Sequence, residues 1–408
     1  MNKLELLAPA GDLEKLKIAV DYGADAVYFG GEMFSLRAGA GNLTVEEIKE
    51  GVAYAHENGV RCHMTLNVFP HNEDIKPLQE YLQQIKDIPI DAFIVSDPAV
   101  MILIREAMPD AELHLSTQAN MTNYVTANYW HQVGVKRLVL ARELTLEEIR
   151  EIRDQIPESM DLESFAHGAM CISYSGRCLL SNFMTGRDAN RGECAHPCRY
   201  KYRLEEEKRP GEYWPVDEDD RGTYIFNSKD LCMLEHIPDL IDAGIMSIKI
   251  EGRMKSIFYI AHVIGAYRKA IDEYYKDPAH YKFQEEWFTE MCKASHREFT
   301  TGFYYRKPTS DDQNYLTSAY TRDYSFTGLV KSYDPQTKIA IVEQRNKMNL
   351  GDTIEVFGPG TDYFVQKLDF MLDEEGTPIE SCPHPQQILQ IKMKQPVGRN
   401  FMLRKESK

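Results

Sequence analysis

Short apolar runs alternate with helix-forming segments through the first part of the sequence, and this alternation limits the possible folds more than any other feature. Eight runs have the length and composition of buried strands: 4–11, 25–31, 61–68, 92–100, 112–120, 135–143, 162–168 and 247–253. Apolar strands separated by helical segments of roughly 10 to 15 residues are typical of parallel strands joined by crossover helices. Eight such units predict an α/β fold, a (β/α)8 barrel of the TIM type.

An open, doubly wound sheet is the alternative for the same alternation. Such a sheet carries a glycine-rich phosphate-binding loop after its first strand, in the pattern G-x-G-x-x-G. Here the first strand is followed by Ala-Pro-Ala-Gly-Asp, which favours the barrel. The helix expected after the second strand begins at Thr44 with Glu47 three residues later, and this spacing predicts a capping box.

The apolar pattern changes its period near the C-terminal end of the sequence. Regular patterning is lost between residues 296 and 324, and beyond it apolar and polar residues alternate one by one between turn signals such as Asp334-Pro335. One-by-one alternation predicts antiparallel strands of a small β-barrel or sandwich. The expected organisation is a barrel over 1–295 with a cysteine-rich insertion at 171–232, a linker over 296–324 and a C-terminal β-barrel domain over 325–408.

The net charge limits the class of partner. The 408 residues include 47 Lys and Arg and 63 Asp and Glu, which gives a net charge of −16. This charge argues against a protein that binds nucleic acid over its whole surface. Basic residues nevertheless gather between residues 171 and 203, where they either meet phosphate or neutralise thiolates and carboxylates. A second basic run at 392–408 is interpreted as a solvated tail, with a phosphate-binding patch as the alternative.

Targeting signals are not expected. No apolar run reaches the length needed to span a membrane. The opening sequence MNKLELLAPAG lacks the charged start and apolar core of a secretory signal, so we predict a cytoplasmic protein without a membrane partner.

Cysteines are concentrated in the predicted insertion. Cys171, Cys178, Cys194 and Cys198 lie among polar, loop-forming residues, and Cys232 follows them. Buried apolar thiols or disulfides explain this context poorly, since it is polar and the cytoplasm is reducing. The paired Cys-x-x-Cys knuckles of zinc sites are absent, so the spacing favours an iron–sulfur cluster.

Polar residues close the predicted barrel strands. In a TIM barrel the active site lies at the carboxyl ends of the strands, so these residues are candidates for a shared site. They are Asn67, Asp97, Gln118, Asn120, Arg142, Glu143, His167, Glu251 and Arg253. His167 has the side chain best suited to acid/base work near neutral pH. Arg142, Arg177 and Arg253 are expected to bind carboxylates.

The pattern E-S-F-x-x-G-A-M-C-x4-G-x-C-x-L-S between residues 163 and 181 resembles the signature of the collagenase-like peptidase family U32. The resemblance extends over essentially the whole chain. It implies a barrel, a C-terminal β-barrel domain and a four-iron four-sulfur cluster held by Cys171, Cys178, Cys194 and Cys232, with Cys198 as the alternative to Cys194. The subgroup that this chain resembles takes part in prephenate-dependent hydroxylation of the wobble uridine of tRNA.

Three functions follow from the residues and the resemblance. The first is a tRNA uridine hydroxylase that takes prephenate, a small dicarboxylate, as co-substrate and acts with a second family member. Its expected catalytic residues are His167 and Glu251, its substrate-binding residues Asp97, Gln118, Asn120, Arg142, Arg177 and Arg253, and its RNA-binding residues Arg187, Arg191 and Arg199. The second is the peptidase of the family name, although H-E-x-x-H and G-x-S-x-G are absent. The third is a non-catalytic iron–sulfur RNA-binding protein.

Overall fold

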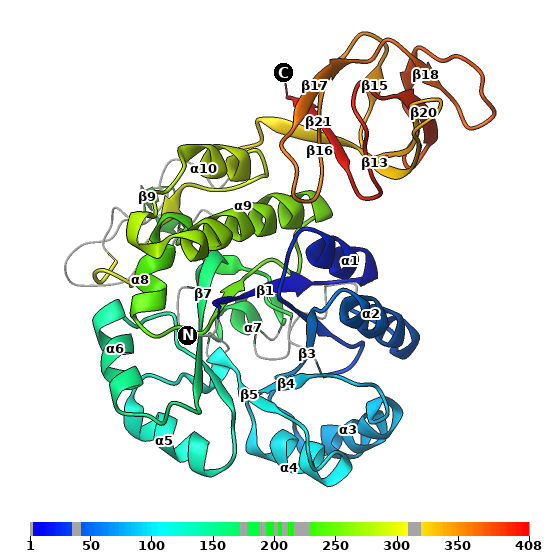
Figure 1. Cartoon of the computed structure of the whole chain (residues 1–408). Coiled ribbons are helices and arrows are strands. Elements are labelled where there is room, and N and C mark those ends of the chain that lie inside the picture. The colour runs from blue at the N-terminus through cyan, green and yellow to red at the C-terminus, as the bar shows by residue number, and fades with distance from the viewer. Residues whose placement is uncertain are drawn as a thin grey trace.

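The predicted (β/α)8 barrel is confirmed by the computed structural model of the chain (Figure 1). The structure describes residues 3–34, 42–171, 174, 178–187, 189, 193–199, 203–205, 211, 213–215, 229–308 and 320–407. Eight parallel strands close into a ring because β11 pairs with both β1 and β7. The strands are β1 (Glu5–Ala10), β2 (Ala26–Gly30), β3 (Arg61–Leu66), β4 (Ala92–Val95), β5 (Leu113–Leu115), β6 (Arg137–Val139), β7 (Asp161–Ala169) and β11 (Ser247–Ile250).

Helices cover the outside of this ring (Figure 1). They are α1 (Leu13–Asp21), α2 (Val45–Glu57), α3 (Asn72–Ile85), α4 (Pro98–Ala107), α5 (Tyr124–Gln132), α6 (Leu146–Asp154), α8 (Ile237–Asp242), α9 (Ile257–Lys276) and α10 (Glu285–Cys292). The capping box predicted at Thr44 and Glu47 is present at the start of α2. Within the described residues, none of these helices combines the length and apolar character that a membrane span needs.

Several strands are shorter than the sequence predicts. The runs 92–100 and 112–120 were expected to be extended throughout, but α4 already begins at Pro98 and a 3-10 turn occupies Thr117–Ala119. The reason is local, because proline at the first helical position has the φ that a helix needs and Asn120 adopts a left-handed φ of 52°. The ends of these runs therefore form turns at the mouth of the barrel.

Two short strands were not predicted. β10 (Asp230–Cys232) runs antiparallel to the end of β7, and β12 (Phe299–Thr300) pairs with β10 inside the stretch interpreted as linker. β7 continues beyond its pairing with β6, so its exposed backbone groups need another partner. Within the cysteine-rich insertion, β8 (Arg203–Glu205) and β9 (Tyr213–Pro215) pair as an antiparallel hairpin.

The predicted C-terminal antiparallel domain is also confirmed. Its seven-stranded sheet has the order β17-β16-β21-β13-β14-β20-β18 and curls around a core of its own. The strands are β13 (Tyr324–Asp334), β14 (Ile339–Gln344), β16 (Thr353–Phe357), β17 (Phe364–Lys367), β18 (Met371–Leu372), β20 (Ile388–Lys392) and β21 (Met402–Glu406), and β15 (Met348–Asn349) pairs with β19 (Ser381–Cys382).

The interpretation of residues 392–408 as a solvated tail is wrong for β21. This strand lies between β16 and β13, and Met402 and Leu403 are fully buried. Arg404 is also 0% exposed, although its side chain is charged. Two adjacent apolar residues at the start of β21 supply the burial that draws the strand into the centre of the sheet.

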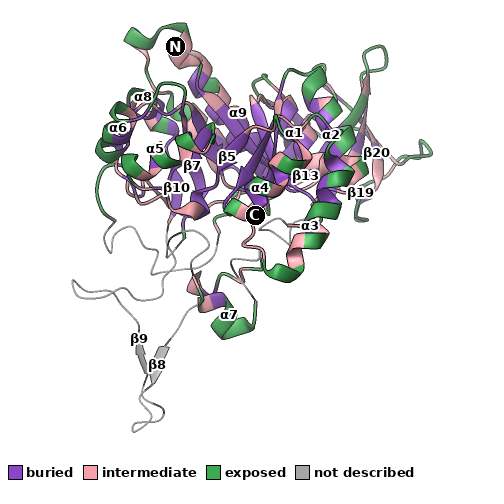
Figure 2. Cartoon of the chain, turned by 90° about the horizontal axis from the view of Figure 1, so that it is seen from below, coloured by how far each residue is buried: buried purple, intermediate pink, exposed green. Residues whose placement is uncertain are grey.

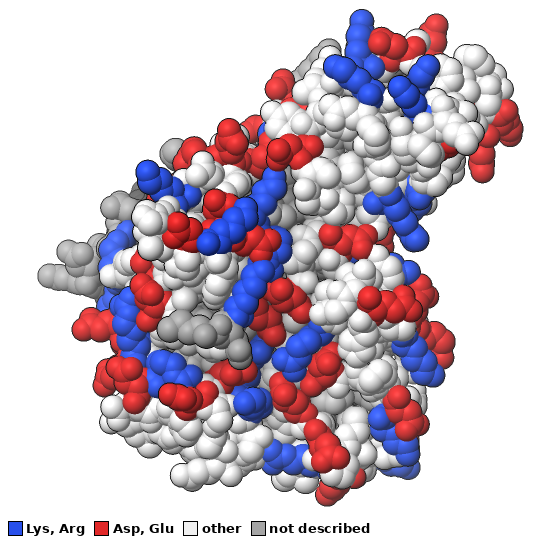
Figure 3. All heavy atoms as spheres, in the orientation of Figure 1, with Lys and Arg blue, Asp and Glu red and all other residues white. Residues whose placement is uncertain are grey.

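Charged groups join the two domains. The Arg404 guanidinium lies 2.7 Å from carboxylates of both Glu290 on α10 and Glu355 on β16, and it donates to His262 Nε2 on α9 at 2.6 Å. Lys293 adds an ion pair to Glu355 at 3.0 Å. Because the charge of Arg404 is buried and shared between elements of both domains, the contact resists separation. Elsewhere, acidic and basic side chains are interspersed over the face shown in Figure 3.

Candidate active site

A cavity of about 800 Å³ opens at the carboxyl ends of the barrel strands. This volume is within the range of roughly 300–1,000 Å³ that small-molecule sites occupy. The barrel provides the floor and one wall, the cysteine segment provides a second wall, and the start of the C-terminal domain provides a third. The cavity therefore lies where enzymes with this fold bind their substrates.

The floor of the cavity holds a buried cation that the sequence reasoning missed. Lys249 Nζ lies 3.0 Å from Glu163 Oε1 and 4.3 Å from the centre of the Tyr28 ring. Glu163 also pairs with Arg137 at 3.2 Å, deeper in the barrel. A signal for Lys249 was present, since the strand alternation that selects Glu251 also places Lys249 on the inward face of β11.

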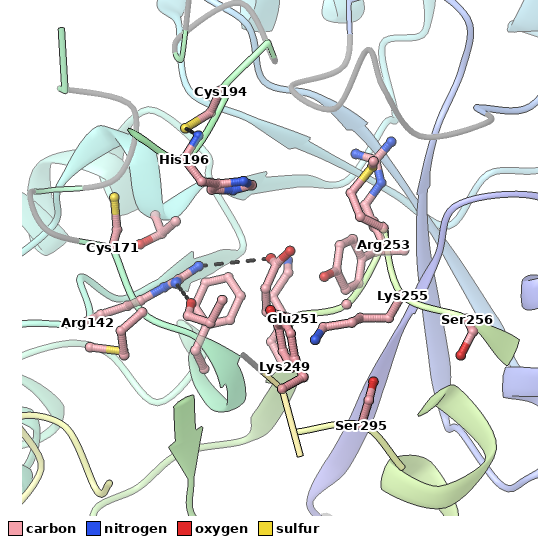
Figure 4. A pocket seen from close by; sticks show the side chains of 18 of the residues that line it. Arg142, Cys171, Cys194, His196, Lys249, Glu251, Arg253, Lys255, Ser256 and Ser295 are labelled. Atoms are coloured by element: carbon pink, nitrogen blue, oxygen red, sulfur yellow. Dashed lines mark hydrogen bonds and ion pairs between the residues drawn. The ribbon is translucent and has the colours of Figure 1, made fainter. Parts of the chain in front are cut away.

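Arg142 and Glu251 meet across the cavity, as their predicted positions at strand ends required (Figure 4). Arg142 Nη1 donates to the Ala169 carbonyl at 2.6 Å, and its guanidinium carbon lies 3.8 Å from the centre of the Phe165 ring. Nη2 approaches Glu251 Oε2 to 4.0 Å. These contacts hold the planar guanidinium in one orientation, which is what bidentate recognition of a carboxylate needs.

A glycine allows this close arrangement. Gly168 has a φ of +106°, and a side-chain carbon placed there would lie 2.5 Å from the Glu251 backbone oxygen. Only glycine combines that conformation with so little space. The end of β7 can therefore approach the Glu251 segment closely enough to form the cavity wall.

Two of the other predicted substrate contacts line the cavity and two do not. Arg253 lines it and donates to Thr65 Oγ1 at 3.3 Å and Asn42 Oδ1 at 2.6 Å, and Gln118 lines it beside Ser96. Asp97 instead caps α4 by accepting from the Ala99 backbone N–H at 2.8 Å. Asn120 ends the 3-10 turn and donates to the Gln118 carbonyl at 3.0 Å, so the structure uses both residues locally and outside the cavity.

Four cysteines line the cavity: Cys171, Cys178, Cys194 and Cys198. Cys232, predicted as a ligand, is 8% exposed and lies outside the cavity lining, with Sγ 4.0 Å from Tyr267 Oη. Burial raises its pKa to about 12. Pairing of β10 with β7 places Cys232 opposite His167, behind the wall that carries Cys171.

Among the described residues that line the cavity, no three ligand atoms lie as close together as the ligands of a single zinc ion. Two sulfurs bound to one zinc ion lie at most about 4.6 Å apart, which is twice the Zn–S bond. Among the described residues, the one group of ligand atoms this close is His56, Cys62 and Asp91, at the amino-terminal end of β3. Thiolates are the usual ligands of iron–sulfur clusters, so the four cavity cysteines are candidate ligands of one.

His167 is not where a general acid or base is needed. It is 2% exposed, lies outside the cavity lining and packs against Tyr259, Tyr267 and Phe299. Burial, together with the charge of Lys255, lowers its pKa to about 3. The expectation of an exposed histidine fails because β10 covers the end of β7, a pairing that the local sequence does not reveal.

The predicted RNA contacts are only partly visible. Arg187 is exposed just after α7 (Leu180–Thr185), which projects from the barrel in Figure 2. Phe183 on the same helix is 88% exposed, an arrangement suited to stacking on a base. Arg177, Arg191 and the side chain of Arg199 lie outside the described residues.

Buried neutral histidines predict acid sensitivity. Burial lowers the pKa of His63, His114 and His262 well below the ordinary value, as it does for His167. Below pH of about 6.5 the unfolded chain binds protons that the folded chain does not, so each histidine removes about 1.4 kcal/mol of unfolding free energy per pH unit. This stability is fully present above that pH and is lost as the pH falls.

We expect urea unfolding at pH 7, 6 and 5 to show this loss. The unfolding free energy of a His63→Gln variant should fall less steeply with decreasing pH, because unfolding of this variant takes up one proton fewer. The matched control is His280→Gln, because the His280 side chain is 82% exposed. Equal stability at pH 7 and pH 5 would contradict the prediction.

The fold is that of a TIM-barrel protein, and its cavity lies where TIM-barrel enzymes have their active sites. Cations, a carboxylate and thiols line this cavity at the mouth of the barrel. The chain belongs to peptidase family U32: the model of that family matches residues 11–314, and the model of the family's C-terminal domain matches residues 322–404. The resemblance seen in the sequence is thereby confirmed.

Three relatives show how the family is represented. The chain is 43% identical over 404 residues to tRNA hydroxylation protein P1 of Bacillus subtilis (strain 168), covering 99% of this chain and 95% of that protein. It is 38% identical to tRNA hydroxylation protein P of Escherichia coli (strain K12), covering 88% and 87%. A protein named collagenase from Porphyromonas gingivalis (strain ATCC BAA-308 / W83) is 31% identical, covering 90% of each chain.

Proposed function

We propose that this protein is a tRNA-hydroxylating enzyme that converts the wobble uridine of tRNA to 5-hydroxyuridine, with prephenate as co-substrate and an iron–sulfur cluster. The observation that carries the proposal is the 43% identity, over 99% of the chain, to a tRNA hydroxylation protein. The cavity at the barrel mouth, which is lined by cations, a carboxylate and thiols, supports an enzymatic role. The tRNA places this function in the cytoplasm.

The cavity has groups that could bind a dicarboxylate. Arg142 supplies positive charge from the end of β6, and Lys249 and Arg253 supply it from the end of β11, whereas Glu251 and Glu163 limit the net charge. Arg142 is the strongest candidate for a bidentate contact because its orientation is fixed by Ala169 and Phe165. Glu251 lies at the same surface and could hold or move a proton during the reaction.

The cysteines could hold the cluster beside these groups. Cys171, Cys178 and Cys194 line the cavity, and either Cys232 or Cys198 would complete the set. A cysteine-ligated cluster supplies electron transfer or structural order when it is bound. The residues of the chain bind the acid, orient it and limit the access of water.

A peptidase is the second candidate, favoured by the relative named collagenase. The geometry gives it little support. A cysteine nucleophile needs a histidine within hydrogen-bond reach, but His167 is buried outside the cavity that Cys171 lines. His196 lines the cavity, and its backbone N–H lies 3.4 Å from Cys194 Sγ, a contact that does not activate a thiol as a base would.

The test combines nucleoside analysis with spectroscopy. We expect tRNA from a strain lacking this protein to lose 5-hydroxyuridine and its derivatives in mass spectrometry, and a plasmid copy to restore them. Protein purified without oxygen should be brown, absorb at roughly 400 nm and contain iron and sulfide. In reconstituted reactions, omission of prephenate should stop product formation. Unchanged nucleosides would overturn the proposed function, and a colourless protein would remove the cluster.

A second family member is part of this proposal as a partner. Affinity purification from cells, with and without ribonuclease, tests whether such a partner is retained by direct contact. Failure to recover it under either condition would contradict this part of the proposal.

A further inference from the structure

The C-terminal domain provides one wall of the cavity, which we call the seam wall. It consists of residues that follow the barrel in sequence and line the same cavity as the cysteine segment. They are Tyr320, Arg322, Tyr324, Arg345 and Asn346. Lys255 approaches this wall from the barrel, just beyond the end of β11 (Figure 4).

The seam wall is held in a fixed position. Arg404 bridges Glu290 of α10 and Glu355 of β16, and Asn400 Nδ2 donates to Asp21 of α1 at 2.5 Å. Arg345 pairs with Glu14 at the start of α1. These contacts span both domains on two sides of the interface. The wall is therefore preorganised relative to the barrel, which lowers the cost of binding a ligand between the two.

Cations and aromatic rings are interleaved along the wall. Lys255 Nζ lies 4.1 Å from the centre of the Tyr320 ring, and the Arg297 guanidinium carbon lies 4.7 Å from it. Such interleaving is typical of surfaces that hold single-stranded nucleic acid, in which cations meet phosphates and rings meet bases. The chain as a whole is acidic, so this group of cations departs from the overall charge of the protein.

Only some of these cations are accessible to a phosphate. The charge of Arg345 is already compensated by Glu14 and Glu343, and Arg297 is buried. Arg322 is exposed, and neither Arg322 nor Lys255 forms an ion pair with the described residues. These two cations line the cavity, and their charge is available to bind a phosphate there.

We propose that the RNA loop crosses the seam between the domains, with the phosphates beside the target base bound by Arg322 and Lys255. This inference rests on the proposed function and names the surface that recognises its RNA. Tyr320 is a positioning residue, because its ring lies against the Lys255 ammonium and holds that cation at the cavity lining. The segment that leads from the barrel into the C-terminal domain is thus part of the RNA site and not only a connection.

The test measures binding of an anticodon stem-loop RNA to the full-length protein at several salt concentrations. We expect Arg322→Glu to weaken binding by about tenfold or more and to reduce the slope of log affinity against log salt by about 0.7 per lost phosphate contact. Tyr320→Ala should weaken binding, and Tyr320→Phe should restore it. Lys392→Glu, an exposed cation elsewhere in the same domain, is the matched control and should bind normally.

The outcomes separate this inference from the proposed function. Thermal unfolding and the absorbance near 400 nm identify variants that are simply misfolded, and Arg322→Gln serves as a second variant if the charge reversal fails to fold. If the wild-type protein binds RNA and supports 5-hydroxyuridine formation, but Arg322→Glu and Arg322→Gln bind RNA with unchanged affinity and salt slope, the seam wall is not the RNA contact. If Arg322→Glu binds RNA normally but no longer binds a protein partner, the inference is also overturned. Failure of the wild-type protein to affect tRNA would reject the proposed function itself.

Discussion

Replacing Arg404 with leucine is expected to lower the free energy of unfolding by about 3–5 kcal/mol, the usual cost of removing one partner from a buried ionic network. The substitution leaves Glu290 and Glu355 without the cation that both approach at 2.7 Å, and it removes the donor to His262. Equilibrium unfolding in urea at pH 7 measures the loss. We expect RNA binding to fall as well, since the seam wall then loses its fixed position.

The control for this variant is Lys405→Ala in the same strand. Lys405 pairs with Asp352 at a partly exposed position, where an ion pair contributes about 1 kcal/mol or less. A double variant, Arg404→Leu with Glu355→Gln, should recover part of the loss because it neutralises one of the two carboxylates that lose Arg404 and leaves Lys293 to pair with Glu290. If Arg404→Leu cost no more than Lys405→Ala, the buried network would not be what holds the domains together.

Replacing Cys171 or Cys194 with serine is expected to abolish both the iron content and the hydroxylation of tRNA. Serine keeps the size and polarity of the side chain but removes the thiolate that binds iron. Iron and sulfide analysis, absorbance near 400 nm and nucleoside analysis of a complemented deletion strain measure the effect. Cys292→Ser is the matched control, since Cys292 lies on α10 outside the cavity lining.

Cys198→Ser and Cys232→Ser decide which residue completes the ligand set. Cys198 lines the cavity in the structure, whereas the resemblance to the family implies Cys232. The variant that loses iron identifies the ligand. If Cys198→Ser loses its iron while Cys194→Ser keeps it, the assignment of Cys194 is wrong.

The barrel could be predicted from the sequence because the patterns that specify its strands and helices are local. Each strand and each crossover helix has its own apolar period, and the parallel order follows once eight units are present. Arg142 and Glu251 were found in the same way, as polar residues at strand ends. Lys249 could also have been found, since it shares the inward face of β11.

The features that were missed depend on residues far away in the chain. Arg404 has the character of a surface cation until its partners are known, and these lie 114 and 49 residues away. Similarly, His167 is buried because β10 pairs with the end of β7 across the cysteine insertion. Neither effect has a local signal, since both depend on which segments meet after the chain has folded.

The central position of β21 has a consequence for biosynthesis. Residues 402–406 lie between β16 and β13, so the C-terminal sheet cannot assemble until they have left the ribosome. The barrel strands are synthesised much earlier, and domains generally fold in order from the N-terminus. The nascent protein therefore passes through a stage with a folded barrel and an unfinished RNA-facing wall, and it becomes competent for its substrate only when synthesis of this strand is complete.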